Sequence, residues 1–381
     1  MSSLSKIESY FDFDLIKSIN GENKLNNYII SPIGLEIILS LCINGAKGHT
    51  QKEILNILKY KSIGEVNNIS YNIISELNKK QEIKLANGIL TKIHPKDKFI
   101  KIGKEQYDAN IEELKNYIHV NKWVSDKTNN KITEIIDYLS PNVMMILLNA
   151  IYFEAFWAIK FDMNQTYDKE FFNIDETKTI VELMFLRDEL LNYYENDTLK
   201  AVKLNYDIKY KSLNAIIILP KNEDYLEENI TNLIENFDSD IYYDIINNLD
   251  NDKSKTRVNF FMPKFKLEFK YDMKKILEDM GMKKAFTKEA EFNNISEKMK
   301  LFVNQVLQKN YINVNEEGTQ ACSITELEVV LECYVVKAEN AKDFIANRPF
   351  IFILRDGECP KGHDIIFFTK VCKFDKKTYD D

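Results

Sequence analysis

The chain has 381 residues, of which 45% are hydrophobic and 29% are charged, a composition typical of a globular protein with a large core. The 59 acidic and 51 basic residues give a formal net charge of −8, which argues against a nucleic-acid binder. Glycine (11) and proline (7) are scarce, which excludes collagen-like and linker-rich proteins. No linker-like stretch and no internal repeat is found, so we predict one continuous domain over residues 1–381.

The start of the chain has no basic segment followed by an apolar run, so we expect no cleaved signal peptide. The two longest apolar runs, residues 29–43 and 143–159, contain polar residues and fall short of the roughly 20 apolar residues of a membrane span. The cysteines are odd in number and widely spaced, and no CxxC occurs: Cys42, Cys322, Cys333, Cys359 and Cys372. Reduced thiols in a cytoplasmic protein fit this pattern, with secretion by another route left open.

No motif of an enzyme is present: the phosphate-binding loop, the dinucleotide fingerprint, the nucleophile elbow and the HExxH zinc motif are all missing from the sequence. The four histidines are far apart and have no ligand partner at helical spacing: His49, His94, His119 and His363. We therefore expect no catalytic activity, no metal and no cofactor.

The first third of the chain has the patterns of amphipathic helices. Residues 33–43 form a candidate buried helix capped by Ser31. Residues 50–53, Thr-Gln-Lys-Glu, have the form of a capping box ahead of a second helix. Apolar side chains recur at three-to-four spacing over residues 121–138, which predicts a further helix there.

The middle of the chain alternates between strand and helix patterns. Strands are predicted over residues 144–153, 215–219 and 258–269. One or two helices are predicted over 223–248, and another over 273–280 that ends at Gly281. From Leu301 the chain is mostly strand-like and closes with a β-hairpin, 350–354 and 365–371. Because helices and strands are partly segregated, the predicted fold class is α+β.

The segment after Val314 begins with Glu316, Glu317, Gly318 and Thr319, a hinge-like sequence because glycine can absorb a large backbone change. The residues that follow can form a long strand, and taking alternate residues separates its two faces. One face is uncharged: Thr319, Ala321, Ser323, Thr325, Leu327 and Val329. The other face holds every charge: Gln320, Cys322, Ile324, Glu326, Glu328 and Val330. Such a strand could enter the middle of a sheet or could be an ordinary half-buried strand, and periodicity alone does not decide.

A series of short motifs resembles the serpin family. In chain order they are residues 27–32, 44–50, 121–124, 128–132 and 148–153, then Trp157, Phe161, residues 262–265, Gly281, residues 285–286, 314–319, 347–350 and 367–371. Each motif is weak alone, but their shared order from residue 27 to residue 371 is specific. The short loops and the abundance of residues with AT-rich codons resemble the intracellular and poxvirus-type serpins.

The resemblance implies a serpin fold with three β-sheets, eight or nine helices and an exposed reactive-centre loop at about 316–346. It also implies a suicide-substrate inhibitor, in which a serine or cysteine protease attacks a loop bond and the cleaved loop then inserts into the main sheet. The expected partner is that protease, in a covalent complex with a monomeric inhibitor. Small residues at Thr319, Ala321 and Ser323 favour this function over the alternative, a non-inhibitory serpin with a binding or chaperone-like role.

Counting from the hinge as in inhibitory serpins, sixteen residues beyond Glu316, gives Glu332–Cys333 as the reactive bond. The upstream subsites would be filled by Val329, Val330 and Leu331. A glutamate at the cleaved position suggests a protease with a basic specificity pocket, such as a granzyme-B-like or glutamate-directed enzyme. Caspases are disfavoured because they prefer aspartate. A shift of the bond to Leu331, Cys333 or Tyr334 stays open.

The resemblance also implies a polar cluster, the shutter, beneath the main sheet, and a tryptophan at the top of that sheet, the breach. The shutter residues here are Ser31, Gly34, Asn149 and Gln308, where Gly34 replaces a serine and Gln308 replaces a histidine of the family pattern. Glutamine both donates and accepts hydrogen bonds, so the cluster could survive that exchange. The breach tryptophan is Trp157, and the preceding Glu154-Ala155 departs from the family's usual Lys-Gly.

Overall fold

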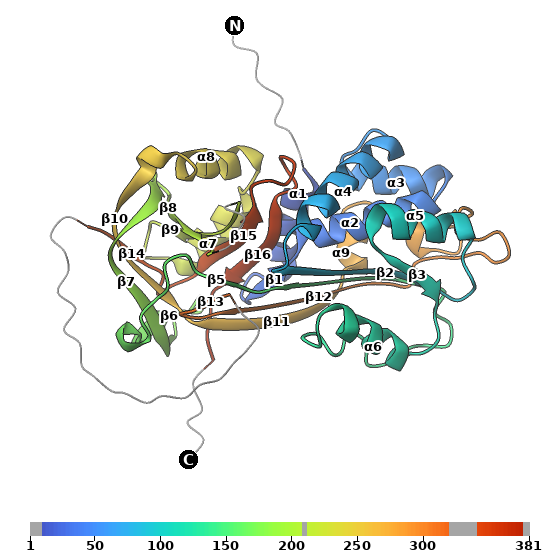
Figure 1. Cartoon of the computed structure of the whole chain (residues 1–381). Coiled ribbons are helices and arrows are strands. Elements are labelled where there is room, and N and C mark those ends of the chain that lie inside the picture. The colour runs from blue at the N-terminus through green and yellow to red at the C-terminus, as the bar shows by residue number, and fades with distance from the viewer. Residues whose placement is uncertain (1–9, 208–211, 320–340, 376–381) are drawn as a thin grey trace, which may run out of the picture.

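The computed structural model describes residues 10–207, 212–319 and 341–375 (Figure 1). Within these residues the α+β class is confirmed, with nine α-helices and two hydrogen-bonded sheets. The helices are α1 Phe11–Glu22, α2 Pro32–Gly45, α3 Gly48–Leu58, α4 Ile63–Asn78, α5 Asp97–Tyr107, α6 Tyr117–Lys127, α7 Leu226–Glu235, α8 Ser239–Leu249 and α9 Lys274–Asp279. No helix of this part of the chain is long and apolar enough to cross a membrane.

The smaller sheet has seven strands. They are β2 Ile83–Thr91, β3 Asn110–Glu113, β4 Met145–Phe153, β5 Ala155–Phe156, β11 Phe265–Asp272, β12 Gln305–Val314 and β13 Gly318–Thr319. Their order is β3-β2-β4-β12-β13-β5, with β11 on the other edge of β12. The two central strands, β4 and β12, are parallel, and their register runs from Ile146 opposite Gln305 to Ile151 opposite Asn310.

The larger sheet has nine strands: β1 Tyr28–Ile30, β6 Tyr167–Phe172, β7 Lys178–Glu195, β8 Leu199–Asn205, β9 Leu213–Pro220, β10 Lys255–Pro263, β14 Lys342–Ile345, β15 Phe350–Asp356 and β16 Ile365–Val371. Its order is β1-β16-β15-β9-β8-β7-β10-β14, and β6 pairs with β7. The 18-residue β7 pairs with β6 over residues 178–183, with β10 over residues 183–192 and with β8 over residues 192–195. This one long strand joins two groups of strands that would otherwise count as separate sheets.

Helix α2 lies in the centre of the molecule, and every one of its residues is buried (Figure 1). It packs against β2 and β4 of the smaller sheet and against β16 of the larger one. Helix α6 covers the opposite face of the smaller sheet, where a second, smaller apolar core lies. There Trp123 of α6 sits over Gly88 of β2, because a Cβ at position 88 would come within 2.8 Å of the indole.

Several predicted elements are confirmed. The helix predicted over 33–43 is α2, and Ser31 caps it by accepting a hydrogen bond from the Gly34 amide at 3.2 Å. The region 223–248 contains two helices, α7 and α8, and the closing hairpin is β15–β16. Gly281 follows α9 with a φ of +115°, a conformation that suits glycine.

The predicted capping box at Thr50 is wrong. Helix α3 begins at Gly48, so Thr50 lies inside it. The Thr50 hydroxyl accepts from the Glu291 amide at 3.1 Å, and the Glu53 carboxylate accepts from the amides of Lys283 (2.9 Å) and Lys284 (2.7 Å). Both side chains are used in tertiary contacts, which local sequence spacing cannot reveal.

The helix predicted over 121–138 is also wrong in extent, because α6 ends at Lys127. The chain then turns through Asn129 and Asn130, which have φ values of 53° and 60°. The Asn121 side chain accepts from the amides of Ile135 (2.9 Å) and Ile136 (3.1 Å) and so holds the returning segment. Ile132, Ile135 and Ile136, whose spacing suggested a helix, lie in this non-helical segment and are buried in the second core.

The strand predicted over 258–269 is two strands. Lys264 separates β10 from β11, and the two belong to different sheets. Both halves have strand-like patterns, so only the pairing partners show where the chain passes from one sheet to the other.

Candidate functional site

The predicted hinge begins a strand in the smaller sheet. Gly318 and Thr319 form β13, which pairs antiparallel with β5 on one side and with Val314 of β12 on the other. The Trp157 amide donates to the Glu317 carbonyl at 2.9 Å, just before this strand. The residues that follow the hinge glutamates therefore lie between the ends of two neighbouring strands.

Gly318 is required by close packing. A Cβ at this position would lie 2.7 Å from Phe156 Cα and 2.9 Å from the Ala155 carbonyl carbon. Both are backbone atoms, which cannot move aside cheaply. The sequence suggested glycine for its backbone freedom, whereas the structure requires it because β5 approaches so closely.

Thr319 is 0% exposed, and its hydroxyl lies 2.8 Å from the Tyr206 hydroxyl. The Tyr206 ring stacks on Trp157, with centroids 4.5 Å apart and planes 14° apart. The Trp157 indole donates to the Asn315 carbonyl at 2.9 Å. Burial raises the pKa of Tyr206, so its hydroxyl stays protonated and available as a donor. Sequence reasoning identified Trp157 but missed Tyr206, which follows β8 and has no local signal of this contact.

The two hinge glutamates have different surroundings. Glu316 is 4% exposed, accepts from the Thr166 hydroxyl at 2.8 Å and forms an ion pair with Lys264 at 3.3 Å. Glu317 points to solvent and pairs with Lys160 at 2.6 Å. A surface pair of this kind contributes little, whereas the buried Glu316 needs its partners.

Ser31, Asn149 and Gln308 come together beneath the two central strands. Gln308 is fully buried and donates to the Ser31 carbonyl at 2.8 Å and to the Asn149 side chain at 2.9 Å. Its carbonyl oxygen accepts from the Ser31 amide at 3.0 Å and from the Asn310 side chain at 2.9 Å. The glutamine thus joins β12 to β4 and to the start of α2.

Two members of this cluster were missed from the sequence. Asn310 donates to the Ile29 carbonyl at 3.2 Å, and Asn87 of β2 accepts from the Asn149 side chain at 2.8 Å. Asn310 lies two residues from Gln308 on the same strand, so it faces the same way, and this spacing could have indicated it. Asn87 has no such signal, because its position depends on the β2–β4 register.

Gly34 is brought to the same cluster, and the structure explains the departure from the family's serine. A Cβ at position 34 would lie 2.8 Å from Asn149 Nδ2 and 2.8 Å from Ile151 Cδ1. The close approach of α2 to β4 at this point leaves no room for a side chain while Asn149 keeps its position.

The remaining predicted site residues lie outside the described residues: Ala321, Ser323, Val329, Val330, Leu331, Glu332, Cys333 and Tyr334. The assignment of the reactive bond therefore stays a prediction. In the described segments, Cys42, Cys359 and Cys372 are buried and unpaired, and no cluster of histidine, cysteine and carboxylate side chains could hold a metal ion.

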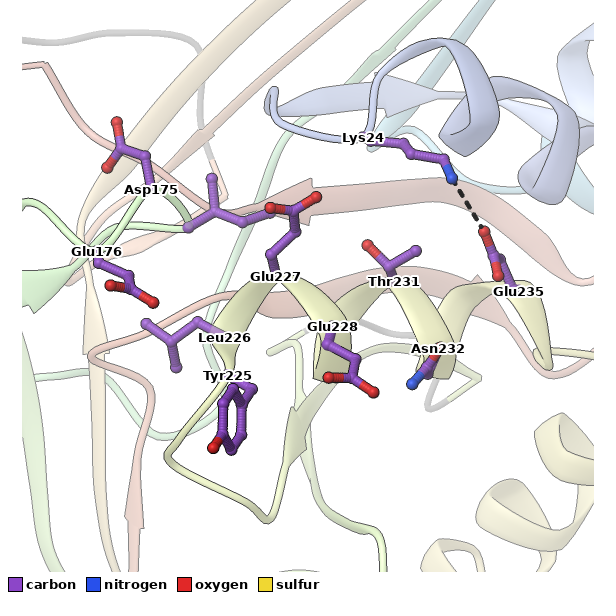
Figure 2. Close-up of a pocket in the computed structure, with 11 residues that line it drawn as sticks. Lys24, Asp175, Glu176, Tyr225, Leu226, Glu227, Glu228, Thr231, Asn232 and Glu235 are labelled. Carbon is purple, nitrogen blue, oxygen red and sulfur yellow. Dashed lines mark ion pairs between the residues drawn. The ribbon is translucent and has the colours of Figure 1, made fainter.

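A groove of about 560 Å³ lies beside α7 (Figure 2). Its cation, Lys24, pairs with Glu235 at 3.5 Å. The other charged side chains that line it are acidic: Asp175, Glu176, Glu227, Glu228 and Glu235. It contains none of the residues predicted for the site.

Comparisons with known proteins agree with this arrangement. A family profile described as "Serpin (serine protease inhibitor)" matches residues 7–374. A leukocyte elastase inhibitor of Xenopus laevis is 30% identical over 374 residues, covering 93% of this chain and 96% of the relative. Intracellular coagulation inhibitor 2 of Tachypleus tridentatus is 31% identical, covering 93% and 88%. The crystal structure of Serpin48 of Tenebrio molitor matches with a TM-score of 0.79 at 27% identity over 96% of both chains. The chain belongs to the serpin family.

Proposed function

We propose that this serpin is a suicide-substrate inhibitor that traps a serine or cysteine protease. The protease nucleophile attacks the carbonyl carbon of Glu332, the amine of Cys333 leaves, and an acyl-enzyme forms. The severed loop then inserts between β4 and β12 before water can release the enzyme. The observation that carries this proposal is β13, because Gly318 and Thr319 already occupy the first positions of the strand that would insert.

The strand pairing favours insertion. A strand continuing from Thr319 would run antiparallel to both of its neighbours, as β13 does. It would replace the parallel β4–β12 ladder of six residue pairs, from Gln305–Ile146 to Asn310–Ile151, with two antiparallel ladders. Antiparallel pairing is slightly more stable per residue, and the uncharged face from Thr319 onward suits burial. The native state is then held by kinetics, and the shutter cluster contributes to that barrier.

The relatives named as inhibitors support this function over a non-inhibitory binding or chaperone-like role. Glu332 at the cleaved position favours a protease with a basic specificity pocket, and Leu331, Cys333 and Tyr334 are the alternatives. We further propose a cytoplasmic monomer that binds neither nucleic acid nor membranes. Its net charge of −8 and the unpaired, buried Cys42, Cys359 and Cys372 support that proposal.

Incubation of the full chain with a panel of serine and cysteine proteases tests the proposal. We expect an SDS-resistant complex with at least one protease, a released C-terminal peptide that begins at Cys333, and a large rise in melting temperature after loop cleavage. Cleavage without a complex and without a rise in melting temperature would establish the non-inhibitory alternative.

The matched variants are Thr319→Arg and Thr319→Ser. Arginine would have to be buried unpaired in β13 and again in the inserted strand, which costs several kcal/mol, so we expect a substrate in place of an inhibitor. Serine keeps the hydroxyl and is smaller by one methyl group, and should leave complex formation intact. Full inhibition by Thr319→Arg would count heavily against insertion.

A further inference from the structure

A buried ionic cluster lies where α1, α2 and the β15–β16 hairpin meet. Glu36 of α2 is 0% exposed, and its Oε2 lies 2.9 Å from Nδ1 of the buried His363. The Tyr60 hydroxyl donates to Oε1 of the same carboxylate. Asp12 of α1 is 1% exposed, and neither of its carboxylate oxygens has a hydrogen-bond partner among the described residues.

The hairpin supplies the other half of the cluster. The Asp364 carboxylate forms an ion pair with Arg355 Nε at 3.2 Å and accepts from the Tyr242 hydroxyl at 2.8 Å. Arg355 also pairs with the half-exposed Asp250 at 3.0 Å. Of the three buried carboxyl groups, Asp364 thus pairs with the permanent cation Arg355, and Glu36 pairs with the titratable cation His363.

The protonation states follow from this balance. Burial, with Glu36 and Asp364 nearby, raises the pKa of Asp12 well above its usual value, so Asp12 is held as the neutral acid. Burial alone would lower the pKa of His363, but the Glu36 charge and hydrogen bond outweigh it, and the pKa is raised. Burial also raises the pKa of Asp364, against the opposing charge of Arg355. The interior is near neutrality when His363 carries its proton and Asp12 keeps its own.

The Glu36–His363 pair lies close in the chain to the Ser31 contacts of the shutter cluster. Residues 28–30 of β1 pair with Phe368–Lys370 of β16, and Glu36 then binds His363 just before the same strand. Ser31 lies between these two anchors, and both its amide and its carbonyl bind Gln308. The segment that leads into α2 is therefore attached to the larger sheet both before and after Ser31, the residue that contacts Gln308.

We propose that the Glu36–His363 pair is a pH-sensitive lock on the first turns of α2. Loss of the His363 proton leaves uncompensated negative charge in the interior, loosens these turns and weakens the Ser31–Gln308 contact. Only one consequence rests on the proposed function, namely that the loosened protein inserts its loop without a protease more quickly.

Other ionisable groups also lie around His363. The rings of Tyr10 and Tyr60 pack against the imidazole, with centroids 5.8 Å and 6.0 Å away. Burial raises the pKa values of Tyr60 and Tyr243 above the ordinary value for tyrosine, so both hydroxyls stay protonated. Lys80 and Asp356 form a separate buried pair at 2.6 Å. Lys370, farther along β16, has its own partners in the carbonyls of Asn23 and Lys24. The charged groups at the rim are Asp250, Glu358 and Lys361.

The direction of the pH effect follows from the raised pKa. The ion pair contributes fully below the unfolded-state value of about 6.5, and its contribution is lost as pH rises through the folded-state pKa. Ionisation of Asp12 at higher pH would add a further negative charge in the same direction. The lock is thus closed in mildly acidic solution and opens as pH rises through the folded-state pKa of His363.

The Ser31 amide gives a direct readout, because it donates to Gln308 Oε1. Its hydrogen-exchange protection factor, which corrects for the pH dependence of free exchange, is measured on the full chain at about pH 6 and about pH 9. We expect protection of this amide in the wild type to be lower at about pH 9 than at about pH 6, because the ion pair is lost as pH rises. His363→Gln should be weakly protected at both pH values.

His94→Gln is the matched control, since the His94 side chain is 70% exposed. It should follow the wild type. Asp12→Asn removes the second titrating group, and its protection should still fall with pH. Equal pH dependence in His363→Gln and His94→Gln would overturn the proposal. If His363→Gln does not fold, a wild-type protection factor that is flat between the two pH values overturns it equally.

A protease complex that never forms, together with the expected exchange pattern, would reject the proposed function and leave the lock standing. If complexes do form, the rate at which the incubated inhibitor loses activity should rise with pH in the wild type and in His94→Gln. A rate that is independent of pH in both would overturn the lock.

Discussion

The hydroxyl groups of Tyr206 and Thr319 lie 2.8 Å apart, and both side chains are buried. This hydrogen bond joins the residue after β8 to the second residue of β13. Tyr206→Phe would leave the Thr319 hydroxyl without this partner, at a cost of about 1–3 kcal/mol. Chemical denaturation should show this loss, whereas Tyr225→Phe, at a side chain that is 72% exposed, should have no measurable effect. In the double variant Tyr206→Phe/Thr319→Val the losses should not add, because both polar partners are gone. Additive losses would mean that the two hydroxyls do not interact.

Gly318→Ala should prevent β13 from docking. The new methyl group would overlap the backbone of Phe156, so the hinge would have to leave the sheet. We expect more cleaved protein and less covalent complex when a target protease is present, as measured by the ratio of the two bands on a denaturing gel. Gly21→Ala is the control, because nothing lies within 4 Å of its added Cβ and alanine suits a helix. An unchanged ratio in Gly318→Ala would show that docking of the hinge is not needed.

Gln308→Ala should lower the barrier to opening the smaller sheet. The change leaves the Ser31 amide and the Asn149 side-chain oxygen without this partner, at a cost of about 1–3 kcal/mol for each buried group, whereas the Ser31 carbonyl still accepts from the Leu35 amide. Thermal inactivation should be faster than in the wild type and in the exposed control Gln106→Ala. Gln308→His restores the residue of the family pattern, and a changed inactivation rate is expected. A rate identical to the wild type in both Gln308 variants would remove this cluster from the barrier.

Lys370 predicts a pH effect of the opposite sign to that of His363. Burial lowers the pKa of Lys370 to about 8, although its ammonium group donates to the Asn23 carbonyl at 2.7 Å. Below about pH 8 the folded protein bears the full cost of the buried charge. Between about pH 8 and the unfolded-state value of about 10.4, stability should rise with pH, by at most about 3 kcal/mol. Lys370→Met should abolish this rise in urea titrations, and Lys98→Met, at an exposed site on α5, should retain it. A rise that persists in Lys370→Met would assign it to another group.

The sequence predicted elements well where one local pattern determines one structure. Ser31 followed by a buried apolar run specified the start of α2, and two continuous apolar runs specified the β15–β16 hairpin. The end of α6 was not predictable, because it depends on hydrogen bonds that the Asn121 side chain accepts from amides 14 and 15 positions later. The break at Lys264 depends on which strands pair with each half.

The residues of the candidate site likewise fall into those that were predicted from the sequence and those that were missed. Gly318 and Gln308 were found because family motifs mark their positions, although the reason for Gly318 was close packing and not hinge freedom alone. Tyr206 and Asn87 were missed because each meets its partner through tertiary structure, whereas the two-residue spacing from Gln308 could have indicated Asn310. Local sequence does not predict such contacts unless the register of the strands is already known.

The tight contact between Gly34 and Asn149 has a consequence for protein engineering. The serine of related serpins cannot be introduced at position 34 by itself, because its side chain would overlap the Asn149 side chain. Restoring the common serine would demand a coordinated exchange at both positions. The residues at positions 34 and 149 therefore depend on each other, and the effect of a substitution at one of these positions in a relative will not transfer to this chain.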